Sequence, residues 1–117
     1  MKITLETIMR VSGSAEDDQR VANEFSREAI AEAEARFENL NTLRSGKAIL
    51  DDAGIRAAKN ALAGIRHLHA LLQEVVEFHR RSELQSVFVA AHKKIGEMLE
   101  KAETIYLRLS SLYPGRR

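Results

Sequence analysis

Residues 82–113, SELQSVFVAAHKKIGEMLEKAETIYLRLSSLY, contain the most regular apolar pattern of the chain. Apolar side chains recur in this stretch at alternating steps of four and three residues, without interruption. They are Leu84, Phe88, Ala91, Ile95, Met98, Ala102, Ile105, Leu109 and Leu112. This spacing is typical of a helix that buries one face against other helices along its whole length. The stretch therefore predicts a long helix in an all-α bundle with coiled-coil character.

Two further long helices are predicted before it, over residues 15–44 and 48–80. The apolar line of the first consists of Ala22, Phe25, Ala29, Ala33, Phe37, Leu40 and Leu43. The apolar line of the second consists of Ile55, Ala58, Leu62, Ile65, His69, Leu72, Val76 and His79. Short connections between such helices predict an antiparallel three-helix bundle, with a four-helix bundle as the alternative.

The helix ends are marked less clearly than the helices. Ser82 and Gln85 have the spacing of a capping box, which favours a tight hairpin before the last helix. The alternative is one continuous helix of about 60 residues that would form its bundle with another copy of the chain. Residues 1–13 are expected to form a short N-terminal arm, in which the apolar residues suit a strand or a short helix equally well.

The composition limits the class of protein. A chain of 117 residues with 44% hydrophobic and 30% charged residues is typical of one globular domain. Cysteine is absent, which excludes disulfides and thiolate metal sites. No apolar run is long enough to span a bilayer, and the N-terminus lacks the apolar core of a signal peptide. We expect a cytoplasmic protein that does not associate with membranes.

The last helix carries more apolar residues than its buried line requires. Val87, Leu99, Tyr106 and Tyr113 flank that line, and an apolar surplus of this kind suits an interface. We therefore expect a non-enzymatic protein-interaction module, such as a small adaptor, chaperone, immunity protein or inhibitor. It would act by docking this helix face on another protein or on a second copy of itself, and it would need no cofactor.

A basic stripe offers an alternative function. Arg56, Lys59 and Arg66 recur along the second long helix and suit contact with a nucleic-acid backbone. Residues 15–45, by contrast, carry eight acids against four bases. The stripe also suits a polar face that pairs with this acidic helix. No aromatic residue accompanies the stripe in the sequence to stack on bases.

The histidines do not have the spacing of a metal site. His67 and His69 are two residues apart and point in different directions on a helix, and no Glu-x-x-His pair is present. His69 and His79 fall on an apolar line. They are expected to be partly buried histidines, and the alternative is a packing point that is sensitive to pH.

The sequence around His92 suggests a third class of function. Residues 92–96, HKKIG, resemble the phosphoacceptor motif of histidine phosphotransfer domains, which are also helical bundles of this size. The lysine and the apolar residue are exchanged at the third and fourth positions, and larger residues at 97–99 replace the small ones of that motif. A solvent-exposed face of histidine and lysines also accounts for these residues.

Overall fold

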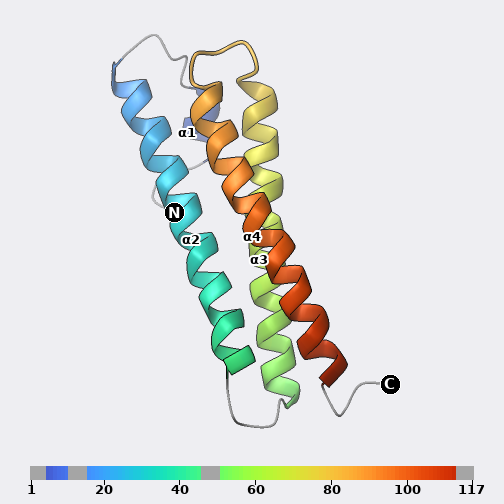
Figure 1. Ribbon diagram of the computed structural model, residues 1–117. Helices are drawn as coiled ribbons and strands as arrows, with labels where there is room; N and C mark the ends of the chain where they lie inside the picture. Colours follow the sequence, from blue (N-terminus) through green and yellow to red (C-terminus); the bar gives the residue numbers. More distant parts are fainter. Residues whose placement is uncertain (1–4, 11–15, 46–50, 113–117) are drawn as a thin grey trace.

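The computed structural model describes residues 5–10, 16–45 and 51–112. Within these ranges the chain forms four helices and no strand: α1 (Leu5–Arg10), α2 (Glu16–Ser45), α3 (Asp52–Phe78) and α4 (Gln85–Leu112). The three long helices lie side by side, with α3 antiparallel to both α2 and α4 (Figure 1). The predicted all-α bundle is confirmed. Helices α2 and α4 run parallel to each other.

The bundle is a long rod. Its principal extents are 54, 21 and 19 Å, and its radius of gyration is 16.7 Å. Helices of 27 to 30 residues account for this length, because each residue adds 1.5 Å to an α-helix. The core is consequently one layer of side chains that follows the common axis of α2, α3 and α4.

The long helices begin and end close to the predicted positions. Helix α2 begins and ends one residue later than expected. Helix α3 begins at Asp52, because the side chain of Asp51 accepts a hydrogen bond from the backbone N–H of Gly54 at 2.8 Å and caps the helix. Gly54 is therefore part of the first turn of α3 and not of a separate turn. The predicted start at residues 48–50 lies outside the described residues.

A turn separates α3 from α4, so the alternative of one continuous helix is wrong. The capping box predicted for Ser82 and Gln85 is also wrong. The Ser82 hydroxyl accepts from the backbone N–H of Leu84 at 3.1 Å, and the Gln85 side chain donates to the carbonyl of Val76 at 3.4 Å. Helix α4 thus begins at Gln85, three residues later than expected, and the Gln85 side chain ties its first turn back to α3.

The described part of the N-terminal arm is helix α1, so the strand alternative is wrong for residues 5–10. Its Ile8 side chain is fully buried, although the sequence pattern did not select it. The Nε2–H of His79 donates to the backbone carbonyl of Ile8 at 2.9 Å. A helix leaves its last four carbonyls without partners inside the helix, and His79 satisfies one of these. The bond ties α1 to the end of α3.

The core follows the predicted apolar lines with one exception. Phe25 of α2 and Phe88 of α4 meet edge to face, with ring centroids 6.2 Å apart and planes at 80°. Three buried alanines of α2, Ala22, Ala29 and Ala33, allow the neighbouring helices to approach closely. The prediction is wrong at Leu112, which is 71% exposed. It is the last residue of α4, where no neighbouring helix covers it.

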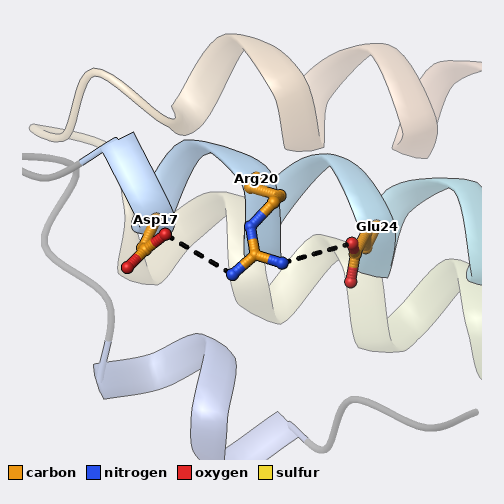
Figure 2. A network of polar contacts seen from close by, with 3 residues as sticks. All are labelled: Asp17, Arg20 and Glu24. Atoms are coloured by element: carbon orange, nitrogen blue, oxygen red, sulfur yellow. Dashed lines mark hydrogen bonds and ion pairs between the residues drawn. The ribbon is translucent and has the colours of Figure 1, made fainter.

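The outer face of α2 carries a small ion-pair network, shown in Figure 2. The Arg20 guanidinium lies between two carboxylates, with Nη2 3.4 Å from Asp17 Oδ1 and Nη1 4.0 Å from Glu24 Oε1. All three side chains are exposed, and exposed ion pairs of this kind contribute little to stability. Packing of the apolar core, and not this network, holds α2 in the bundle.

Candidate functional site

Two hollows lie one after the other on the face that α2 and α4 share, and we treat them together as one shallow groove. Its α2 wall contains Asn23, Ile30, Phe37 and Arg44, and its α4 wall contains Val87, Lys94, Lys101 and Arg108. Each set repeats every seven residues, which is close to two helical turns. The residues of each wall therefore form a single strip along their helix, and we refer to the space between the strips as the α2–α4 groove.

The groove deepens at two places. We call the first the apolar hollow; its volume is about 490 Å³, and its lining consists of Asn23, Ser26, Arg27, Ile30, Val87, Ala90, Ala91 and Lys94. We call the second the basic hollow; its volume is about 400 Å³, and its lining consists of Phe37, Asn41, Arg44, Lys101, Thr104, Ile105 and Arg108. Each is within the size range of pockets that bind small molecules or the side chains of a partner.

Each hollow contains a buried polar atom without a hydrogen-bond partner. These atoms are Ser26 Oγ in the apolar hollow and Asn41 Oδ1 in the basic hollow. Most buried polar groups in folded proteins have a partner, because an unpaired one carries a desolvation penalty of about 1–3 kcal/mol. A bound molecule that supplies a hydrogen-bond donor would remove this penalty at both positions.

The rims of the groove are predominantly basic. Their cations are Arg27, Arg44, Lys94, Lys101 and Arg108. The seven-residue spacing places two acids on the same walls. Glu34 lies seven residues from both Arg27 and Asn41 on α2. Glu97 lies seven residues from both Ala90 and Thr104 on α4. Five cations against two acids give the groove walls a net positive charge, which favours negatively charged molecules over positively charged ones.

The residues predicted to form an interface on the last helix do not form one exposed surface. Val87, Leu99 and Tyr106 are partly buried and pack against the core, so the bundle itself uses most of the apolar surplus. Only Val87 contributes to the α2–α4 groove. Tyr113 lies outside the described residues. The large apolar side chains that are exposed in the described residues are Phe78, Val89, Leu107 and Leu112.

The predicted basic stripe is only partly retained. Arg56 and Lys59 line a hollow of about 360 Å³ together with Tyr106 of α4. The expectation that no aromatic accompanies the stripe is therefore wrong, because Tyr106 comes from another helix. Asp52 lines the same hollow and offsets part of its positive charge. Arg66 lies about two turns beyond Lys59 along α3, where its Nη2 is 4.0 Å from Glu103 Oε2.

Two histidines that are far apart in the sequence stack on each other. The rings of His69 on α3 and His92 on α4 have centroids 4.2 Å apart and planes at 21°. A Cβ at Gly96 would lie 3.1 Å from His69 Nε2, so this glycine leaves the space that the stack needs. His92 Nε2 is buried without a hydrogen-bond partner. His92 is therefore only partly exposed, whereas Lys93 and Lys94 are exposed as that interpretation expects.

We expect stability to depend on pH through His92. Burial, and secondarily the neighbouring His69, lower the pKa of His92 below its ordinary value of 6.5. Below that value the unfolded chain binds a proton at His92 while the folded chain does not, so acid favours unfolding. We expect the free energy of unfolding, measured with urea, to fall as the pH is lowered from about 7.5 through 6.5 towards the lowered pKa.

Substitutions at two histidines test this expectation. His92→Gln should weaken the dependence on pH, whereas His67→Gln, at an exposed position, should leave it as in the wild type. An unchanged pH dependence in the His92→Gln variant would show that His92 is not the source of the pH dependence of stability.

In the described ranges, residues 5–10, 16–45 and 51–112, no group of three or more His, Cys, Asp or Glu side chains is placed to hold a metal ion. None of the helices in these ranges is both long enough and apolar enough to cross a membrane. Comparison with known proteins adds nothing to the geometry: no family model matches the chain, and no curated protein or solved structure is significantly similar to it.

Proposed function

We propose that the chain is a protein-interaction module that binds an acidic amphipathic helix of a partner protein in the α2–α4 groove. The observation that carries the proposal is the groove itself, with its apolar floor, its basic rims and a buried unpaired polar atom in each hollow. An amphipathic helix recognises such a groove by placing its apolar face on the floor and its charges against the rims.

The seven-residue repeat of the walls supports a helix as the bound element. A helix that packs along a bundle repeats its contacts every seven residues, so its apolar positions match the spacing of Ile30 and Phe37 on one wall. The mechanism is helix-face docking, as expected from the sequence, but on a different face. Val87 keeps its assigned role, while Leu99 and Tyr106 stabilise the bundle in this proposal.

A binding assay tests the proposal. The probe is a fluorescently labelled amphipathic peptide with leucine at the a and d positions and glutamate elsewhere; a lysine-rich peptide of the same pattern serves as its control. We expect saturable binding of the acidic peptide only. Ala90→Glu places a carboxylate in the apolar hollow at an exposed position and should weaken binding at least about tenfold, or about 1.4 kcal/mol.

The matched control is Ala70→Glu, an exposed alanine on α3 outside the groove, which should bind as the wild type does. Equal binding of both peptides, or an equal loss in both variants, would contradict the proposal. Light scattering of the same protein samples before peptide is added tests the expectation of self-association. Each variant is compared with the wild type by circular dichroism, so that unfolding is not mistaken for lost binding.

A second candidate function is contact with nucleic acid through Arg56, Lys59 and Tyr106. It is favoured by one observation, the aromatic ring beside the two cations, which suits stacking on a base. The same assay with labelled single-stranded and duplex oligonucleotides discriminates. Affinity that falls steeply with salt and is lost on removing Arg56 and Lys59 would support this candidate. No affinity at low salt would exclude it.

A further inference from the structure

Three cations from two helices surround the basic hollow. They are Arg44 at the end of α2 and Lys101 and Arg108 on α4. Among the residues that the structure describes, no carboxylate lies within ion-pair distance of any of the three. Like charges gathered at one place repel one another, so the arrangement raises the free energy of the folded chain unless an anion binds there.

The helix dipoles do not offset the repulsion among these three cations. A cation in the last turn of a helix is stabilised by the partial negative charge at that end, and Arg44 occupies such a position in α2. Lys101 is eleven residues before the end of α4, well beyond the reach of this effect. The ends of α2 and α4 together supply about one negative charge, against three full positive charges around the hollow.

The floor and one wall of the hollow favour an organic anion over a simple ion. Phe37 and Ile105 supply apolar surface, and Asn41 supplies a carboxamide whose Oδ1 is buried and unpaired. The Thr104 hydroxyl already donates to the carbonyl of Glu100 at 3.1 Å. Asn41 is thus the polar group available to a ligand, and rotation of its amide by 180° exchanges the acceptor and the donor.

We propose that the basic hollow is a binding site for an organic anion that joins a phosphate or carboxylate group to a flat apolar body. The charged group lies between Arg44, Lys101 and Arg108, and the apolar body lies on Phe37 and Ile105 beside the Asn41 amide. Guanidinium groups suit this role, because their N–H donors match the oxygens of phosphate and carboxylate. The volume of about 400 Å³ fits a ligand of one or two rings.

This inference goes beyond the proposed function and does not require a partner helix. The two are separable by position, since Ala90 lies in the apolar hollow and the three cations lie in the basic hollow. Ala90 does not line the basic hollow, so the variant Ala90→Glu should lose the acidic peptide and keep the anion. A free metabolite and a modified side chain of a partner could both supply the chemistry, and the free ligand is tested here without any partner.

The test is a titration of the isotope-labelled full chain with 1-naphthyl phosphate, followed by NMR chemical shifts. Two fragments serve as comparison ligands: inorganic phosphate supplies the anion alone, and 1-naphthol supplies the apolar body alone. We expect saturable shifts centred on residues 37–44 and 101–108, with affinity for 1-naphthyl phosphate at least about tenfold higher than for either fragment. Arg108→Gln and Lys101→Gln should each weaken binding by about tenfold, and both positions are exposed, so the fold should persist.

Arg81→Gln is the matched control, because it removes an exposed cation in the turn before α4, whereas the basic hollow is lined by the last turns of that helix. It should bind 1-naphthyl phosphate as the wild type does. The proposal is overturned if no saturable shift occurs, if the shifts lie on other faces, or if Arg81→Gln weakens binding as much as Arg108→Gln. It is also overturned if inorganic phosphate binds as tightly as 1-naphthyl phosphate, which would indicate attraction to charge alone.

Discussion

Replacing Phe88 with alanine is expected to lower the free energy of unfolding by about 3–5 kcal/mol. The Phe88 side chain is fully buried, and its ring contacts Phe25 of α2 and lies 5.0 Å, centroid to centroid, from His79. Its removal leaves a cavity at the point where α2, α3 and α4 meet. The loss would be a large fraction of the 5–15 kcal/mol that stabilises a typical domain. Urea denaturation followed by circular dichroism measures it.

Phe78→Ala is the control for this prediction. Phe78 is the same residue type but is 57% exposed, and its main aromatic contact is the neighbouring His79. We expect a loss of about 1 kcal/mol or less, because an exposed side chain leaves no cavity when it is shortened. Comparable losses for the two variants would show that the core does not lie where the structure places it.

Replacing His79 with alanine is expected to release α1 and to lower the free energy of unfolding by about 2–4 kcal/mol. His79 is buried, and its Nε2–H is the donor to the Ile8 carbonyl. The variant loses this bond, leaves a buried carbonyl unpaired and opens a space beside Phe88. Hydrogen exchange should show lost protection in α1, while the amides of the α3 and α4 cores stay protected.

His79→Gln separates the hydrogen bond from the packing. The glutamine side chain can present an amide N–H near the position of His79 Nε2, so it should restore part of the protection of α1. If α1 exchanged at the same rate in the wild type and in His79→Ala, the bond to Ile8 would not be what holds it. If His79→Gln behaved as His79→Ala did, packing of the ring would be the main cause.

The sequence predicted the long helices because their cores repeat over many turns. The last helix was predicted from nine apolar positions between Leu84 and Leu112, so the misassignment of Leu112 alone did not change the prediction. Helix α1 is too short for such averaging. Its six residues contain fewer than two turns, so its apolar residues suited a strand as well as a helix, and the pattern did not single out the buried Ile8.

The candidate site could not be predicted from the spacing of residues within one helix. The α2–α4 groove, the stack of His69 on His92 and the place of Tyr106 beside Arg56 all depend on how far one helix is shifted along another. The turns and the packing of the whole core determine that shift, so it cannot be predicted from any one stretch of the sequence. The seven-residue repeat of Lys94, Lys101 and Arg108 was a usable signal, and it was overlooked because apolar positions were sought first.

The rod shape of the bundle affects how its mass in solution has to be measured. A compact chain of this length would have a radius of gyration of about 13 Å, and this one has 16.7 Å. An elongated particle experiences more friction than a sphere of equal mass, so it elutes early from a gel-filtration column and tumbles slowly about its short axes. A monomer of 13.1 kDa will therefore elute with the apparent size of a heavier globular protein. Elution volume alone would mimic a dimer, whereas scattered light intensity reports the mass itself.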